Sequence, residues 1–460
     1  MTNYKPSTAL RGLGFLLLLT SCSDPILKAP EPQVHFSDYT ETPLVHKLVV
    51  KKLTYEGSSL PTGTEIGIFT WEGVLGGAGV WDADSGVTIN VYGSSEDVVQ
   101  FFSGDNFDPR IYNPRTGETH YADLIRKAGW DNWTENAISE VEIRGFETRE
   151  TVVELVEGWN LISINVVPLR SMYTERDRTD KGPDIRRMFS QLTSSDPPNL
   201  HIVKDERGDF YVPFRNFNGI SFWDFNSGYH VKVSRPVTCR WEGKPIPANQ
   251  IINLNRGWKI LPYLPTYPLT CDSINFYAIS LIRTQVVVVK DESGHFADPA
   301  RKFSNMLPWH EGQAFLIYMR TELSTIYPAP EADVPEIVPD TAGVTIGPWT
   351  MPHRRGNYES ILIESFNGIT PGPGDGVAAF SMSDVLSGVG PVAGGRCGMA
   401  VWGDDLTTEE IEGFRYGESY VLRYWSESEN RIYELSSTLI QGDQMTYTTD
   451  GYSVVSATVR

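Results

Sequence analysis

The feature that most constrains this fold is an internal duplication that covers most of the chain. Gly63-Thr-Glu-Ile-Gly-Ile-Phe-Thr70 reappears as Gly374-Asp-Gly-Val-Ala-Ala-Phe-Ser381, at an offset of 311 positions (374 minus 63). Val74-Leu-Gly-Gly-Ala-Gly79 and Val385-Leu-Ser-Gly-Val-Gly390 repeat at the same offset. Self-similarity at a fixed offset indicates copies of one structural unit. We therefore assign the two outer parts of the chain to modules A1 and A2.

A second pair of copies lies between the two A modules. Glu157-Gly-Trp-Asn-Leu-Ile-Ser163 is matched by Arg256-Gly-Trp-Lys-Ile-Leu-Pro262, and His201-Ile-Val-Lys-Asp-Glu-Arg-Gly208 by Val287-Val-Val-Lys-Asp-Glu-Ser-Gly294. The offset falls from 99 (256 minus 157) to 86 (287 minus 201), so the first copy holds thirteen extra residues (99 minus 86). We place this insertion in a surface loop near 171–184 and name the two copies B1 and B2.

The matching segments have the periodicity of strands and the residues of tight turns. Tyr229, Val231 and Val233 alternate with polar neighbours, and the β-branched run 286–289 leads into a Lys-Asp-Glu-Ser-Gly turn. Helical periodicity is confined to short segments, which are Ala122–Ala128, Ile185–Leu192 and Ile274–Ile279. The sequence therefore predicts an all-β, multidomain fold, with four antiparallel β-sandwich modules in the order A, B, B, A and few short helices.

The repeats and the composition between them set the boundaries of the modules. These are a signal peptide at 1–21, a lipidated tether at 22–37, A1 at 38–150, B1 at 151–248, B2 at 249–327, a linker rich in proline and acids at 328–341, and A2 at 342–460. Proline-rich chains are extended, at about 3.1 Å per residue. We therefore expect the linker to let A2 move independently of the other modules.

The N-terminus has the layout of a secretory signal. Lys5 and Arg11 precede the apolar run 12–19, which is shorter than the roughly 20 residues that a transmembrane helix needs. The run ends in Leu-Thr-Ser followed by Cys22, which resembles the bacterial lipobox. The resemblance implies that Cys22 is the lipid attachment point of an outer-membrane protein, facing the periplasm or the cell surface. An ordinary signal peptide with an unmodified Cys22 is the alternative.

The charge balance restricts the partners. The chain has 39 Lys and Arg against 58 Asp and Glu, a net charge of -19. Such a surface repels phosphates, so nucleic acid is excluded as a partner. The partners that remain are the membrane, through the lipid anchor, and a protein or a glycan.

An aromatic residue and an arginine recur at matching positions of the two A modules. Tyr92 and Arg110 in A1 correspond to Trp402 and Arg423 in A2. The two residue types could form a stacking platform for a sugar ring. The favoured interpretation is a structural cation-π pair, worth about 0.5 to 2 kcal/mol. In the B modules, Trp159 and Trp258 begin apolar runs, so we expect both in the core.

Two further groups of residues suggest cross-links or metal binding. Cys239 and Cys271 could form a disulfide across the boundary between the B modules, and three unrelated buried thiols are the alternative. Asp404, Asp405 and Glu409 could supply oxygen ligands to calcium, although solvated loop acids are the commoner outcome. No other cofactor is expected, because the zinc patterns Cys-x-x-Cys and His-x-x-x-His are missing from the sequence.

The module patterns resemble a known set of bacterial domains. Gly-Trp-Asn-Leu-Ile-Ser, Val-Lys-Asp-x-x-Gly and Gly-Tyr-x-Val-Lys in B1 are similar to a tandem module of large secreted and surface proteins of the Bacteroidota. Val401-Trp-Gly-Asp-Asp405 and Arg423-Tyr-Trp425 in A2 look like the β-sandwich module that often accompanies it. The resemblance implies non-catalytic modules with no settled ligand.

We therefore expect a lipid-anchored cell-envelope protein that acts in binding, adhesion or scaffolding. Catalysis is not expected, because the Gly-x-Ser-x-Gly nucleophile motif does not occur and the repeats leave no separate domain for a reaction centre. The main alternative is a glycan-capture lipoprotein beside a polysaccharide-uptake system. An unrecognised hydrolase is a third, less favoured reading.

Overall fold

The computed structural model describes residues 35–173, 182–194, 196–220, 222–335, 343–354, 356–406, 408–442 and 445–460. Strands dominate these residues, and their α-helices are limited to the single turns α1 (Ile185–Met188) and α2 (Ser190–Thr193). The predicted all-β, multidomain fold is confirmed. Within the same residues, no helix has the length and apolar character needed to cross a membrane. The signal peptide and Cys22 lie outside the described residues.

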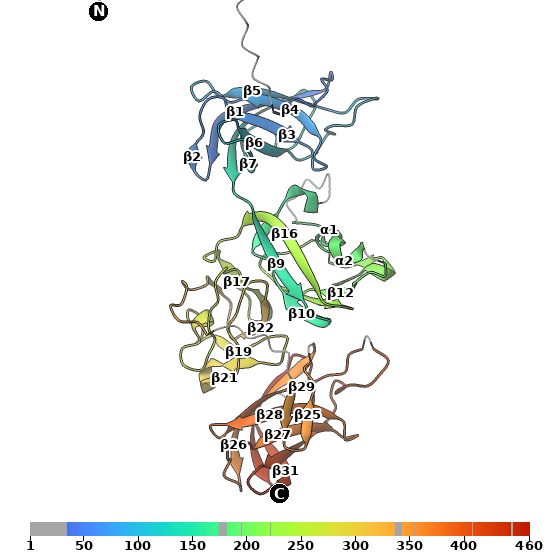
Figure 1. Ribbon diagram of the computed structural model, residues 1–460, viewed down its shortest axis with the longest axis vertical. Helices are drawn as coiled ribbons and strands as arrows, with labels where there is room; N and C mark the ends of the chain where they lie inside the picture. Colours follow the sequence, from blue (N-terminus) through green and yellow to red (C-terminus); the bar gives the residue numbers. More distant parts are fainter. Residues whose placement is uncertain are drawn as a thin grey trace, which may run out of the picture.

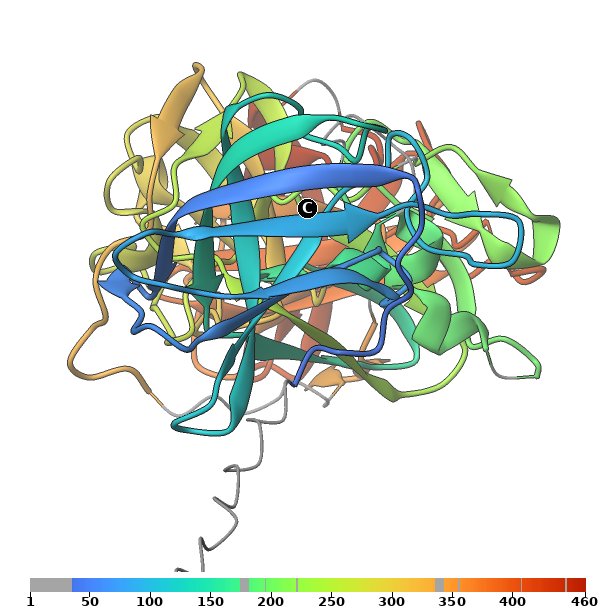
Figure 2. The same cartoon turned by 90° about the horizontal axis from the view of Figure 1, so that it is seen from above.

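The modules are arranged along one axis (Figure 1). A1 lies at the N-terminal end, B1 and B2 occupy the middle, and A2 lies at the opposite end. Seen down the long axis, the strands of A1 overlie the rest of the molecule, while green strands of B1 reach its rim (Figure 2). The molecule is therefore longer than it is wide, with A1 and A2 at its two ends.

Module A1 is one eight-stranded sheet in the order β2-β1-β8-β7-β6-β3-β4, with β5 paired to β1. Its strands are β1 (Val45–Tyr55), β2 (Ser58–Ser59), β3 (Glu65–Phe69), β4 (Leu75–Val80), β5 (Val87–Tyr92), β6 (Asp108–Asn113), β7 (Glu118–Ala128) and β8 (Ile138–Phe146). The pair β1 and β8 is parallel, and the other pairs are antiparallel. The sheet curls around an apolar core that contains Ile66, Ile89 and Val141.

Module A2 repeats this strand order but closes into a barrel, β26-β29-β28-β27-β30-β31-β32. Its strands are β24 (Val344–Ile346), β25 (Trp349–Met351), β26 (Tyr358–Asn367), β27 (Gly376–Ser381), β28 (Leu386–Ala393), β29 (Arg396–Trp402), β30 (Tyr420–Ser426), β31 (Arg431–Gln441) and β32 (Tyr452–Val459). The barrel closes because β28 also pairs with β29. The parallel pair recurs as β26 and β32, with a register shift after Ile363 that matches the shift after Val50 in A1.

The two B modules also share one strand order. B1 comprises β9 (Arg149–Leu155), β10 (Gly158–Ile162), β11 (Val166–Pro168), β12 (Leu200–Lys204), β13 (Phe210–Val212), β14 (Phe217–Asn218), β15 (Tyr229–Val233) and β16 (Val237–Pro245). B2 comprises β17 (Ile252–Leu254), β18 (Gly257–Pro262), β19 (Val286–Lys290), β20 (Phe296–Asp298), β21 (Phe303–Ser304), β22 (Ala314–Met319) and β23 (Leu323–Thr325). Their main sheets, β10-β15-β12-β13-β14 and β18-β22-β19-β20-β21, are equivalent strand by strand.

The helix predictions met three different outcomes. Ile185–Leu192 is helical, as α1 and α2. Ile274–Ile279 forms only the short 3-10 helix η3 (Tyr277–Ile279). The helix prediction for Ala122–Ala128 is wrong, because this segment is the end of β7, paired along most of its length with β8. Tertiary pairing here overrides the local preference for a helix.

Contacts between modules contradict the predicted freedom of A2. Leu362 and Val454 of A2 form one buried apolar cluster with Val288 and Phe296 of B2. Each of these four side chains is fully buried, and burial of one such side chain is worth about 1.5 to 3 kcal/mol. The linker therefore joins two modules that are docked on each other.

Charged side chains complete the junction where B1, B2 and A2 meet. The ammonium group of Lys232 in B1 lies 2.8 Å from the carboxylate of Asp405 in A2. Lys290 of B2 is buried and donates to the backbone carbonyl of Tyr358 in A2 at 2.9 Å, and burial lowers the pKa of Lys290 to about 8. The ion pair and the hydrogen bond each form only when the two modules concerned are correctly placed. These polar contacts therefore fix how A2 is oriented on B1 and B2.

Candidate functional site

The structure gives the recurring arginines of the A modules different aromatic partners from those expected. The guanidinium of Arg110 lies 4.1 Å from the ring centre of Phe69, and that of Arg423 lies 4.3 Å from the ring centre of Phe380. Phe69 and Phe380 are equivalent residues on β3 and β27, the strands paired with those of the arginines. The cation-π pair is thus repeated, but Tyr92 and Trp402 are not part of it, because they lie on β5 and β29 instead.

The expected sugar platform is also closed. Tyr92 and Trp402 are each only 7% exposed. Tyr92 stacks on Tyr39 with ring centres 5.9 Å apart, and Trp402 packs on Tyr358 at 5.0 Å. Buried rings cannot receive a sugar, so these two positions are structural.

The matching tryptophans of the B modules have different environments. Trp159 is buried, but it lies under A2, where its indole Nε1 donates to Asp405 at 3.1 Å. The expectation for Trp258 is wrong, because its side chain is 38% exposed and packs edge-on against Tyr318. The difference arises because A2 covers B1 at this position and leaves the equivalent position of B2 open.

The predicted calcium ligands are not gathered around a common point. Asp405 forms the ion pair with Lys232, and Asp404 accepts a hydrogen bond from the backbone N–H of Glu412 at 3.0 Å. Glu409 lies on the exposed part of the same loop. Over the described residues, no cluster of three or more His, Cys, Asp or Glu has a metal-binding arrangement. Asp404 therefore stabilises its own loop, and Asp405 stabilises the junction between A2 and B1.

The proposed disulfide is not formed. Cys239 and Cys271 are free thiols, and each lies in the core of its own module, B1 or B2. Burial raises the pKa of Cys239 to about 12, so its reactive thiolate form is suppressed. Two thiols that each pack inside a separate core cannot form a bond between the modules.

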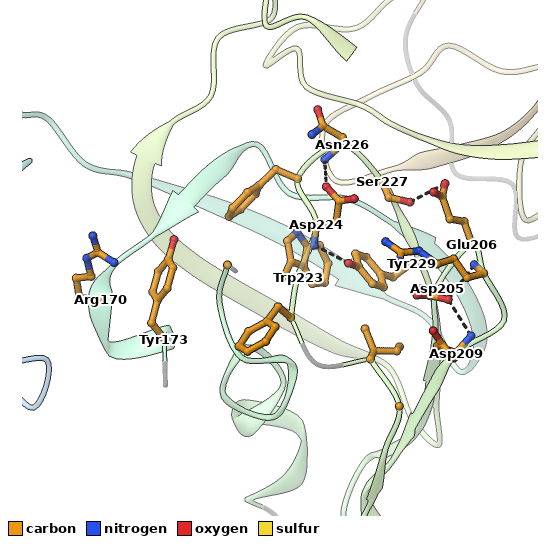
Figure 3. Close-up of a pocket in the computed structure, with 16 residues that line it drawn as sticks. Arg170, Tyr173, Asp205, Glu206, Asp209, Trp223, Asp224, Asn226, Ser227 and Tyr229 are labelled. Atoms are coloured by element: carbon orange, nitrogen blue, oxygen red, sulfur yellow. Dashed lines mark hydrogen bonds between the residues drawn. The ribbon is translucent and has the colours of Figure 1, made fainter. Parts of the chain in front are cut away.

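A cavity of about 650 Å³ in B1 is a candidate binding site (Figure 3). Its walls come from the β12–β13 turn, from the loop that precedes β15, and from η1 (Arg170–Met172) with Tyr173. The lining combines carboxylates with aromatic rings, among them Asp205, Asp209, Asp224, Trp223 and Tyr229. Carboxylates beside aromatic rings can bind the hydroxyl groups and the apolar faces of a sugar.

Most of the carboxylates in this cavity already hold the local backbone in place. Asp205 accepts hydrogen bonds from the backbone N–H groups of Arg207 and Asp209, both at 2.9 Å, and burial raises the pKa of Asp205. Glu206 accepts from Lys259 of B2 at 2.7 Å and from Ser227 at 3.1 Å. These acids stabilise the turn and the contact with B2, which leaves Asp209 as an exposed acid at the rim.

The buried indole at the base of the cavity has the same environment in both B modules. Trp223 is 2% exposed, and its Nε1 has no hydrogen-bond partner among the described residues. Trp309, the equivalent residue of B2, is fully buried, and its Nε1 likewise has no hydrogen-bond partner among the described residues. Because the feature recurs in B2, we assign it to packing and not to ligand binding.

B1 carries an exposed aromatic group that its sequence alone does not reveal. Phe210, Phe214 and Phe217 are 39%, 68% and 47% exposed, at the rim formed by β13, η2 (Pro213–Arg215) and β14. The spacing of these residues, four and three positions apart, gives no alternation that separates a buried from an exposed side. The equivalent residues of B2 are Phe296, Ala300 and Phe303. Alignment of the two B copies is therefore the sequence signal that could have identified the exposed phenylalanines.

Comparison with known proteins does not place the chain in a family. No family model matches the sequence, and no curated protein matches it. Among solved structures, the chain is similar to the Bacillus anthracis TIE protein at 8% identity and a TM-score of 0.13, over 90% of this chain and 51% of that one. It is also similar to BcpA, the major pilin subunit of Bacillus cereus, at 8% identity and a TM-score of 0.11, over 90% and 99% of the two chains. The chain thus spans about half the length of the first of these proteins.

Proposed function

We propose that the chain is a lipid-anchored cell-envelope protein whose β modules act, without catalysis, in binding or scaffolding. The observation that carries this proposal is the docking of A2 on B1 and B2 through a buried apolar cluster and paired charges. Docked modules hold their surfaces in one fixed arrangement, which a scaffold requires. A flexible string of modules could not do so.

The state of the carboxylates supports a non-catalytic role. A glycosidase needs two carboxyl groups facing one substrate bond, roughly 5 to 10 Å apart. In the B1 cavity, Asp205 and Glu206 are already engaged by hydrogen bonds within the protein. Asp224 accepts from the backbone N–H of Asn226 at 2.9 Å. These bonds suit carboxylates that hold a scaffold in place.

The anchoring part of the proposal is tested by Cys22→Ser. We expect the wild-type chain to partition into the detergent phase of an envelope extract and the variant to move to the aqueous phase. Cys239→Ser is the matched control, because its thiol is buried in B1 and should leave partitioning unchanged. A Cys22→Ser chain that still fractionates with membranes would contradict the lipid anchor.

Glycan capture remains a second candidate, and it rests on the B1 cavity alone. The cavity combines an exposed acid, Asp209, with the half-buried ring of Tyr173 at its rim. If the cavity binds sugars, affinity-gel retention on a polysaccharide should fall with Asp209→Asn. Asp84→Asn, at an exposed turn of A1, is the control. Equal retention of both variants and the wild-type chain would remove the only support for this candidate.

A further inference from the structure

The exposed aromatic rim of B1 has a buried counterpart in B2. In B1, the rings of Phe210 and Phe217 lie 4.9 Å apart, at an angle of 36°. In B2, the rings of Phe296 and Phe303 lie 5.0 Å apart, at the same angle. The hairpins also share their register, because Val212 pairs with Phe217 as Asp298 pairs with Phe303.

The turns that carry the two ring pairs are equivalent as well. Each hairpin contains a short 3-10 helix that begins with proline, η2 in B1 and η4 (Pro299–Arg301) in B2. Each helix ends at a residue in the left-handed region, Asn216 with φ 48° and Lys302 with φ 51°. The two rims are therefore the same surface, built twice.

In B2, module A2 covers this surface. Phe296 is fully buried against Leu362 and Val454. The ring of Phe303 lies so close to strand β29 that a Cβ atom on Gly398 would be 2.1 Å from its Cζ. The covering face is thus the outer side of barrel strands β26, β29 and β32, with a glycine opposite the phenylalanines and aliphatic side chains beside it.

The same interface also has a polar rim. Arg301 of B2 donates to Gln441 of A2 at 2.8 Å, and its guanidinium lies 3.6 Å from Glu364. Arg215 is the equivalent residue of B1, where its guanidinium lies 5.2 Å from the ring centre of Phe214. A molecule that covers the B1 rim should therefore offer an amide or carboxylate oxygen to Arg215.

The geometry points to B1 as the docking surface for a second polypeptide, one that presents an A2-type face: a β-sheet with aliphatic side chains around a glycine and an acceptor at its edge. This inference rests on the proposed binding function and names the surface and the class of partner. The partner is another protein, because the A2 face formed by Leu362 and Val454 already covers B2.

Module A1 of a second copy does not have this face. The paired registers of β1, β5 and β8 place Val49, Thr88 and Glu140 where A2 has Leu362, Gly398 and Val454; these are the three covering positions. Thr88 would collide with the rings that Gly398 admits, and Glu140 would bury a carboxylate against phenylalanine at a high desolvation cost. Thr88 and Glu140 are accordingly exposed in A1.

The test uses a photo-reactive phenylalanine analogue, p-benzoylphenylalanine, at position 214 or 217 of the full anchored chain in its own cells. We expect a cross-link to a different polypeptide, with the linked residue mapped by mass spectrometry to the outward face of a β-strand that contains glycine. Phe217→Ser should lower the cross-linking yield from position 214 by about tenfold, the effect of losing about 1.4 kcal/mol of binding. Thermal unfolding of each variant verifies that B1 remains folded.

Control positions distinguish failure of the proposed docking surface from failure of the proposed binding function. The same analogue at Trp130 of A1 and Tyr416 of A2, which are 59% and 74% exposed, samples surfaces away from the rim. A cross-link from the rim to a second copy of the chain, to lipid or to glycan would overturn the inference. Cross-links to a protein from the control positions but not from the rim would overturn it and leave the binding function standing. No cross-link to any protein from any position would contradict both.

Discussion

Replacing Gly398 by alanine tests whether A2 is docked on B2, because the two arrangements give effects of opposite sign. In the docked arrangement, the new Cβ would lie 2.1 Å and 2.6 Å from two atoms of Phe303 and 3.1 Å from Phe296, all in B2. Ordinary carbon contacts are about 3.5 to 4.0 Å, so the ring of Phe303 must move by more than 1 Å. Overpacking of this kind costs about 1 to 3 kcal/mol.

An undocked A2 would respond in the other direction. Gly398 would then lie on the open face of strand β29, where glycine is less favourable than alanine by about 0.5 to 1 kcal/mol. Gly398→Ala would therefore stabilise a free A2 module. Whether Gly398→Ala lowers or raises the unfolding free energy therefore distinguishes a docked A2 from a free A2, whatever the size of the effect.

Differential scanning calorimetry of the full chain provides the measurement. We expect the transition that contains A2 docked on B2 to fall by about 2 to 12 °C, since 1 kcal/mol corresponds to about 2 to 4 °C for a folding unit of about 150 to 250 residues. Gly372→Ala is the control within A2, because its Cβ would meet only Asp375, at an ordinary 3.6 Å. An unchanged or higher transition temperature for Gly398→Ala would refute the docked arrangement.

A double-mutant cycle assigns the effect to the interface. Phe303→Ala removes the ring that the new methyl group meets, so Gly398→Ala should cost less in that background than in the wild-type chain. Residues in contact show coupling energies of about 0.5 to 3 kcal/mol. Additive effects would show that the loss arises inside A2 and not at its contact with B2.

Three groups of titratable side chains give further tests. Burial lowers the pKa of His46 to about 4, below the unfolded value of 6.5, so the unfolded chain binds more protons between these pH values. The unfolding free energy should then fall by up to about 3 kcal/mol as the pH drops from 6.5 to 4, a slope that His46→Gln should remove in urea titrations. Asp405→Asn removes the carboxylate charge that lies 2.8 Å from the ammonium of Lys232 and should cost about 1 to 3 kcal/mol; a loss below about 0.5 kcal/mol would contradict a stabilising ion pair. Cys239 and Cys271 should react with a thiol reagent only after unfolding and without prior reduction, whereas no reaction in denaturant would indicate a disulfide.

The modular all-β fold was predictable because its signals are local. Alternating apolar residues, β-branched runs and Asp-Gly turns report directly on strand and turn formation. Because the segments are repeated, a strand assigned in one copy of a module is also expected in the other copy. The wrong helix at Ala122–Ala128 shows the limit, because pairing of β7 with β8 depends on residues far along the chain.

The docking of modules was not predictable from the sequence, because it depends on which finished faces meet. Phe210 with Phe217 and Phe296 with Phe303 have the same local pattern, yet one pair is exposed and the other is covered by A2. The recurring Arg110 likewise revealed a repeated contact but not its partner, Phe69, which the strand pairing alone brings near.

Small-angle X-ray scattering of the Cys22→Ser chain in solution would show most directly whether the four modules form one fixed array. With A2 docked on the B modules, the curve should fit a single particle with the dimensions of the structure, and Gly372→Ala should leave it unchanged. If A2 is instead undocked and connected only by the linker at 328–341, the maximum dimension of the particle would increase by up to about 40 Å. This is the length of the linker when it is fully extended at about 3.1 Å per residue. Such an increase, measured on the chain with an unaltered A2 module, would contradict the docked arrangement of the modules.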